Sequence, residues 1–132
     1  MKISAKEHYG LRAIAELAGR FGQGPVPVSA VATAQGISED YLEQVLPMLR
    51  DAGLVHSTRG AHGGYVLARQ PDQISVGEVM RALDGEILPI HCVSEDDALP
   101  CDRGGTCASR AVWEAISARV LDALEGMTLA DL

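Results

Sequence analysis

Residues 28–51 read VSAVATAQGISEDYLEQVLPMLRD, and this stretch decides the fold. Apolar residues at helical spacing predict one short helix over 29–34 and a second helix over 39–51. Between them, Gly36 supplies a turn and Ser38 supplies a side chain suited to cap the second helix. A short helix, a glycine turn and a capped helix are typical of a helix-turn-helix, although any helical hairpin has the same outline.

The residues that follow favour a DNA-binding unit. Runs of β type at 54–58 and 65–68 flank Arg59-Gly60-Ala61-His62-Gly63-Gly64, which predicts a hairpin with a basic, glycine-rich tip. Directly after a helix-turn-helix, such a hairpin is the wing of a winged helix. There Arg59 would reach into a minor groove, and the glycines would let the backbone approach a phosphate. The alternative for Arg59 and His62 is a solvated turn.

Three further helical patterns flank this unit. One covers residues 4–20, with Ser4 and Glu7 forming a capping box, and another covers 74–83, with Ser75 placed to cap it. The longest covers 108–124. It carries Trp113 and one apolar stripe, made of Val112, Ile116, Val120 and Leu124. We expect this last helix to be a dimerisation arm, the alternative being that it docks on its own domain.

The expected fold is therefore mainly α with a small β-hairpin wing: a winged helix-turn-helix followed by a long C-terminal dimerisation helix. We divide the chain into a DNA-binding domain over 1–84, a cysteine-bearing loop over 85–107, and the dimerisation helix and tail over 108–132.

Charge and composition bound the function. The net charge is −7 over 132 residues, which by itself disfavours a nucleic-acid partner. However, residues 1–70 carry a net charge of +1 and the remainder −8, so the few cations of the first half are free to converge on one face. We see no apolar run of membrane-span length and no signal-peptide core, and we expect a cytoplasmic protein that does not bind a membrane. No nucleophile–base pair, phosphate loop or paired acid predicts an enzyme or a small-molecule substrate.

All three cysteines, Cys92, Cys101 and Cys107, lie in the polar loop between the last two helical patterns, with the spacing Cys-x8-Cys-x5-Cys. In the cytoplasm thiols stay reduced, and an odd number cannot pair off within the chain, so metal or redox chemistry explains the cluster better than disulfides do. Structural zinc sites usually contain close Cys-x2-4-Cys pairs, which are absent, whereas iron–sulfur clusters accept longer loops. Both [2Fe-2S] and [4Fe-4S] clusters are compatible with the spacing.

Taken together, these segments resemble the IscR and NsrR family of bacterial regulators. The resemblance rests on GISEDYLEQVL at 36–46, LRDAGLV at 49–55, RGAHGGYVL at 59–67 and ISVGEV at 74–79. The cysteine loop ahead of a long helix with Trp113 resembles the iron–sulfur members. The resemblance implies an intertwined homodimer on a partly palindromic operator of double-stranded DNA.

The resemblance also implies the site. The helix over 39–51 would be the recognition helix, and Arg59 would enter the minor groove. The residues of this helix and its cap that would face DNA are Ser38, Tyr41, Glu43 and Gln44. Gln44 would read a base, and Ser38 and Tyr41 would bind phosphates. One departure is Pro47, which lacks the amide that would bond to the Glu43 carbonyl and is expected to kink or break the helix.

The fourth cluster ligand is also implied by resemblance. Some members supply a histidine three residues after the last cysteine, where this chain has Arg110, which cannot ligate iron. Others take the ligand from the first helix of the partner subunit, and the matching position is His8. Glu7 and His91 are the next candidates.

We therefore expect a transcriptional regulator, a repressor, whose operator binding is controlled by an iron–sulfur cluster that senses iron, redox or nitric oxide status. Two alternatives remain open. One is a cluster-free regulator that senses through its thiols, and the other is an iron–sulfur redox protein that does not bind DNA.

Overall fold

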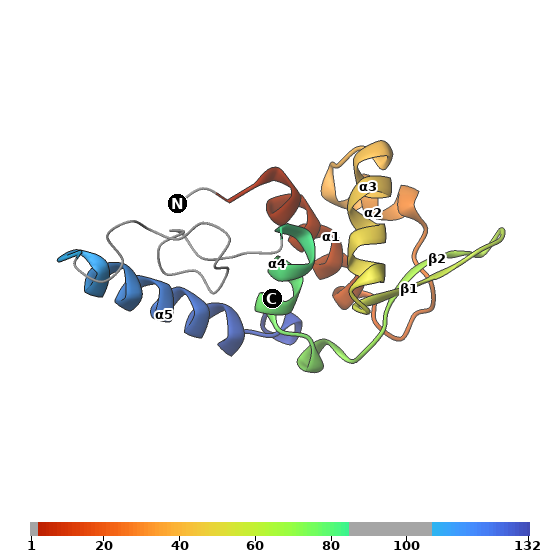
Figure 1. The fold of residues 1–132 in the computed structure, drawn as a ribbon. Helices are drawn as coiled ribbons and strands as arrows, with labels where there is room; N and C mark the ends of the chain where they lie inside the picture. The colour runs from red at the N-terminus through yellow and green to blue at the C-terminus, as the bar shows by residue number, and fades with distance from the viewer. Residues whose placement is uncertain (1–2, 85–106) are drawn as a thin grey trace.

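The computed structural model describes residues 3–84 and 107–132. Four helices and a hairpin form a compact head (Figure 1): α1 (Ala5–Gly19), α2 (Val28–Gln35), α3 (Glu39–Asp51), β1 (Val55–Thr58), β2 (Gly64–Leu67) and α4 (Val76–Asp84). A short 3-10 helix, η1 (Pro71–Gln73), joins β2 to α4. The hairpin projects from one side of the head and α5 (Arg110–Gly126) from the other, and η3 (Leu129–Asp131) follows α5. The expected class, mainly helical with a two-stranded wing, is confirmed.

The head is built around one apolar core. α1 contributes Ala13, Ile14 and Leu17, all buried. The amphipathic face of α3 packs against them and contributes Leu42, Val45, Leu46 and Leu49. Because these residues recur every three or four positions, they lie on one side of each helix. The opposite side of α3 therefore faces solvent.

Local signals set the helix ends as expected. Ser4 and Glu7 form a reciprocal capping box, in which the Ser4 amide donates to the Glu7 carboxylate at 2.7 Å and the Glu7 amide donates to Ser4 Oγ at 3.2 Å. Gly36 ends α2 in the left-handed conformation with φ of 64°, which glycine adopts at least cost. Ser38 Oγ accepts a bond from the Tyr41 amide at 3.2 Å and so begins α3.

Pro47 does not break α3. The helix runs from Glu39 to Asp51 with the proline inside it. The core residues Val45, Leu46 and Leu49 lie on both sides of Pro47 and are buried. We attribute the continuity to this burial, which outweighs one missing amide bond.

The wing is anchored to the head at its base. β1 and β2 pair antiparallel, with Val55 opposite Leu67 and Thr58 opposite Gly64. Tyr65 on the second strand also exchanges two backbone bonds, of 2.8 and 2.9 Å, with Val26, just before α2. The segment just before α2 is therefore hydrogen-bonded to the second strand of the wing.

The C-terminal segment returns to the head. α5 covers 110–126, two residues later than expected, and its end packs against α4. Met127 accepts a backbone bond from Val76 at 2.8 Å, and Leu129 donates one to Ile74 at 3.0 Å. Leu129 is only 2% exposed and belongs to the core of the head. The core thus includes a residue from the far end of the chain.

Among residues 3–84 and 107–132, no helix combines the length and the apolar character that crossing a membrane would require.

Candidate nucleic-acid interface

The exposed face of α3 carries the residues predicted to meet DNA. Ser38, Glu43 and Gln44 are exposed, while Tyr41 is half-buried. Ser38 Oγ accepts the bond from the Tyr41 amide, which leaves its hydroxyl proton available for a phosphate oxygen. The carbonyl group and the amide group of Gln44 together suit an adenine edge. Four of the predicted residues therefore lie at one end of one helix.

Tyr41 is held in place by contacts with α1. Its ring meets the Tyr9 ring edge-on, with centroids 5.5 Å apart and an interplanar angle of 74°. Tyr9 in turn meets His8 edge-on at 5.1 Å and lies under the Arg12 guanidinium at 5.6 Å. Such aromatic pairs are worth about 0.5–1.5 kcal/mol beyond the area that they bury. Tyr9 thus orients the first turn of α3, a role that the sequence did not reveal.

A second set of contacts fixes α2 against α1. The Arg12 guanidinium donates to the Gln35 side chain at 3.3 Å and also to the Gln35 backbone carbonyl. The Gln35 amide donates to Glu16 at 2.8 Å, and Glu16 pairs with Arg20 at 2.9 Å. These contacts hold the carbonyl end of α2, and therefore the turn before Ser38, at a set place on α1.

The wing tip presents two polar side chains to solvent. Arg59 and His62 are exposed, as a phosphate or groove contact requires. Gly63 and Gly64, however, lie against the protein's own backbone, because a Cβ at these positions would collide with the carbonyl oxygens of Thr58 and Val26. These two glycines are therefore needed for the turn itself. Around Gly60 there is open space, which leaves its backbone accessible to a phosphate.

Of the predicted cluster ligands, Cys107 and His8 lie in the described residues, while Cys92, Cys101 and His91 lie outside them. Cys107 lies three residues before α5, and its Sγ is 3.1 Å from Ser109 Oγ. The Ser109 side-chain hydrogen bond lowers the pKa of the Cys107 thiol, and the Ser109 backbone and the nearby Arg110 charge act in the same direction. A thiolate is the form that binds iron, so Cys107 suits a metal ligand.

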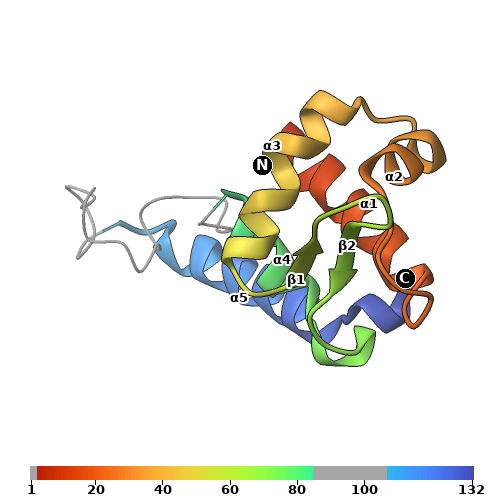
Figure 2. The same cartoon turned by 90° about the vertical axis from the view of Figure 1, so that its right-hand side faces the viewer.

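The two candidate ligands of one chain lie on separate parts of the molecule. His8 is exposed on the first helix of the head. The beginning of α5, three residues after Cys107, projects away from the head in both views (Figures 1 and 2). Within residues 3–84 and 107–132, no three His, Cys, Asp or Glu side chains gather in a metal-binding group. Glu7 is buried, and its carboxylate accepts the bond from the Ser4 amide.

The fold and this interface define a winged helix-turn-helix DNA-binding protein. Comparison with known proteins places it more narrowly. Residues 3–132 match the family model Rrf2, described as an iron-dependent transcriptional regulator. The chain belongs to the Rrf2 family of transcriptional regulators.

Several relatives are similar along the whole chain. The regulator CymR of Bacillus subtilis is 42% identical over 132 residues, which cover all of this chain and 89% of CymR. The regulator IscR of Sodalis glossinidius is 38% identical, covering all of this chain and 78% of IscR. Because these relatives are named transcriptional regulators, the expectation of a regulator and not an enzyme is confirmed.

Solved structures agree with the fold. CymR, described as the global cysteine regulator of B. subtilis, superposes with a TM-score of 0.83 at 40% identity, covering 99% of this chain and 95% of that one. IscR of T. potens superposes with a TM-score of 0.78 at 42% identity, covering 99% of this chain and 85% of that one. A cysteine regulator and an IscR thus share this architecture, so the fold does not specify the signal.

Proposed function

We propose that this regulator is a homodimeric, cytoplasmic repressor whose operator binding is controlled by an iron–sulfur cluster. Cys92, Cys101 and Cys107 would supply three thiolates, and His8 of the partner subunit the fourth ligand. The observation that carries this proposal is the position of Cys107 just before the end of α5 that projects from the head, together with the lowered pKa of its thiol. A cluster held in this way joins two protomers, and its state would change the placement of their heads.

The dimer is proposed to form through α5. Val112 is 54% exposed and Ile116 40% exposed on this helix, although both are large and apolar. Val120 and Leu124, on the same stripe, are half-buried. An exposed apolar stripe on a projecting helix suits the same stripe of a second copy, because a two-fold pair buries both.

A charge on this stripe tests the dimer. We expect Ile116→Asp to convert the dimer into a monomer in light scattering, because the interface would have to bury an unpaired carboxylate. Ala118→Asp is the matched control, since Ala118 is exposed on the same helix, about 160° around its axis from Ile116. The proposal fails if Ile116→Asp remains dimeric, or if both variants dissociate alike.

Anaerobic purification tests the cluster. We expect a brown protein with iron and inorganic sulfide, and an operator affinity that changes when the cluster is removed. His8→Ala should alter the absorption and electron paramagnetic resonance spectra, whereas His56→Ala, an exposed histidine of the wing, should leave them unchanged. Unchanged spectra in both variants would remove His8 from the ligand set.

A cluster-free thiol regulator is the second candidate. It is favoured by the lowered pKa of the Cys107 thiol, since thiolates react with oxidants, and by the similarity to a structure described as a cysteine regulator. A colourless protein whose DNA binding responds to oxidation and to Cys107→Ser would support it. The electron-transfer alternative is disfavoured by membership of a family of transcriptional regulators.

A further inference from the structure

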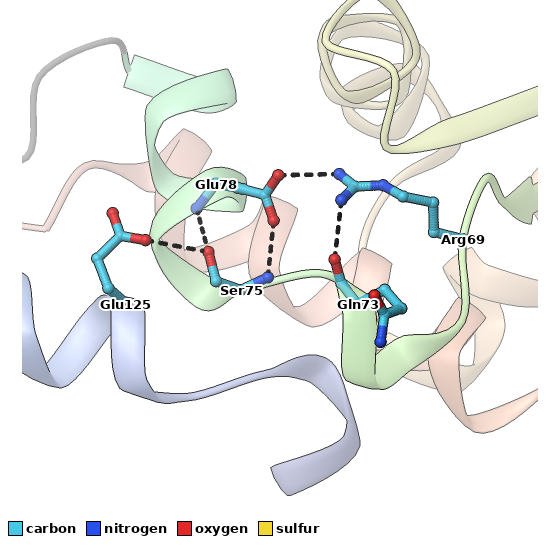
Figure 3. Close-up of polar contacts among 5 residues, drawn as sticks. All are labelled: Arg69, Gln73, Ser75, Glu78 and Glu125. Carbon is cyan, nitrogen blue, oxygen red and sulfur yellow. Dashed lines mark hydrogen bonds and ion pairs between the residues drawn. The ribbon is translucent and has the colours of Figure 1, made fainter.

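A set of polar side chains connects the base of the wing, the beginning of α4 and the end of α5 (Figure 3). We call this set the joint. It consists of the side chains of Arg69, Ser75, Glu78, Arg81 and Glu125 and the backbone carbonyl of Gln73, and Figure 3 draws all of them except Arg81. Arg69 follows β2 by two residues, and Glu125 is the second-last residue of α5. The wing base and the beginning of α4, which are neighbours in the sequence, therefore meet the end of α5, 50 residues after Ser75.

Glu78 lies at the centre of the joint. One carboxylate oxygen accepts from the Arg69 guanidinium at 2.9 Å, and the other accepts from the Ser75 amide at 2.9 Å. Arg69 also donates to the Gln73 carbonyl at 2.8 Å, and the Glu78 amide donates to Ser75 Oγ at 3.1 Å. The wing base is thus tied to the cap of α4.

Glu125 extends the joint to α5. Its carboxylate accepts from Ser75 Oγ at 3.4 Å and forms an ion pair with Arg81. Gly77 lies against the same carboxylate, and a Cβ on Gly77 would be 2.7 Å from Glu125 Oε1 and 2.8 Å from Cδ. The Glu125 carboxylate can therefore lie here only because Gly77, one turn of α4 before Arg81, has no side chain.

We propose that the joint sets the angle of α5 relative to the head, with Glu125 and Arg69 as positioning residues. This inference rests on the proposed dimer through α5. In such a dimer the angle of α5 fixes the distance between the two recognition helices, and half-sites lie about one helical turn, ~34 Å, apart. The joint thereby determines which half-site spacing the regulator accepts.

The chemistry of the joint favours a positioning role over a stabilising one. The ion-paired side chains are 38–45% exposed, and exposed ion pairs add little to stability. Their bonds nevertheless join separate elements, so losing them changes orientation more than folding. The joint holds the C-terminal end of α5, and the rest of the helix projects from the head (Figure 1), so a small rotation at that end is amplified along the helix.

Gly77→Ala tests the proposal without changing a charge. The added methyl displaces the Glu125 carboxylate from Ser75 and Arg81, while alanine favours the α4 helix more than glycine does. Glu125→Gln removes the ion pair at constant size. Asp122→Asn, an exposed carboxylate on the same helix, is the matched control.

The probe is a duplex operator selected by the wild-type protein from random DNA, together with versions whose half-sites are moved apart or together by one base pair. We expect Gly77→Ala and Glu125→Gln to bind the selected spacing about threefold or more weakly and to discriminate less among the spacings. Dimer mass and melting temperature should stay as in the wild type. In a protein that already carries Glu125→Ala, Gly77→Ala should cause no further loss of operator affinity. Asp122→Asn should have the operator affinity and spacing preference of the wild type.

A wild-type spacing preference in both variants would overturn the proposal. So would an equal loss of affinity at every spacing accompanied by a lower melting temperature, which indicates a structural role alone. A wild-type protein that is monomeric, or that selects no sequence, would overturn the proposed function instead, and this inference with it.

Discussion

At the scale of single residues, the interface depends on side chains that serve both the fold and the ligand. Ser38 caps α3 through its oxygen, and its hydroxyl proton is proposed to bind a phosphate. Tyr41, in the first turn of α3, packs edge-on against Tyr9. We therefore expect substitutions at Ser38 or Tyr41 to change both stability and DNA binding. Substitutions at exposed residues of the wing tip should change DNA binding without changing stability.

Arg59 is such a separable residue, because it is exposed at the wing tip. We expect Arg59→Ala to weaken operator binding by about 1–3 kcal/mol and to lower the magnitude of the salt slope by about one. Thermal stability should not change. Arg119→Ala, an exposed arginine of α5, is the control for the loss of one positive charge. Equal losses in fluorescence anisotropy titrations of the two variants would mean that only overall charge matters.

Glu78 makes stability depend on pH. Partial burial raises the pKa of Glu78, but bonds from the Ser75 amide and from Arg69 outweigh it, so the pKa lies below its ordinary value of 4.5. A lowered folded-state pKa stabilises the fold above the unfolded-state pKa, and the gain disappears as the pH falls through the folded-state pKa. We expect Glu78→Gln to cost about 0.5 kcal/mol at pH 7.

This difference between wild type and Glu78→Gln should close as the pH falls below about 4.5. Urea titrations across the pH range measure it. Asp122→Asn, which removes an exposed carboxylate of α5, is the matched control. A gap that stays constant down to the acid transition would contradict the assigned ion pair.

At the scale of elements, the close approach of three helices depends on one glycine of α1. A Cβ at Gly10 would lie 2.5 and 2.7 Å from the two methyl groups of Leu83 on α4, and 3.0 Å from Val45 on α3. All three positions are buried. The φ of Gly10 is not positive, so the backbone conformation does not require glycine here. The lack of space for a Cβ does require it.

We therefore expect Gly10→Ala to lower the free energy of unfolding by about 1–3 kcal/mol through overpacking. Gly19→Ala, in the same helix with open space around it, should raise the free energy of unfolding by up to about 1 kcal/mol. Chemical denaturation measures both. Similar effects of the two substitutions would show that helix propensity, and not packing, controls α1.

At the scale of the whole molecule, the C-terminal tail completes the core of the head. Leu129 is 2% exposed among core residues, whereas Leu132, three residues later, is 57% exposed. Leu129→Ala should cost about 2–4 kcal/mol of unfolding free energy, and Leu132→Ala less than about 0.5 kcal/mol. Comparable small losses in both would mean that the tail detaches readily from the head.

The net charge of −7 predicts the affinity of the whole protein for DNA that lacks an operator. With few cations at the interface, non-specific affinity should be modest. The logarithm of the binding constant should fall with the logarithm of salt concentration with a slope below about 5 in magnitude. Titrations on random duplex DNA between low and physiological salt measure this slope, and a steeper one would reveal phosphate contacts beyond α3 and the wing.

Local chemistry is what the sequence by itself determined. The helix-turn-helix with its caps at Gly36 and Ser38, the cap of α1 at Ser4, and the hairpin with Arg59 at its tip depend on neighbouring residues. Their pattern is therefore visible in the chain. The exposed positions of Ser38, Glu43 and Gln44 follow from the same helical period. The predicted helix boundaries differ from the observed ones by at most two residues, because helix ends depend on which cap forms.

Contacts between distant residues are what only the tertiary structure decided. The continuity of α3 through Pro47, the docking of Leu129, and the seat of Glu125 against Gly77 each depend on surfaces that meet only after folding. The packing energy depends on how side chains from different elements fit together in the core. The periodicity of the sequence does not predict this fit. The sequence therefore determined which residues share the exposed face of α3 and the wing tip. The tertiary structure decided how α5, which projects from the head, is held.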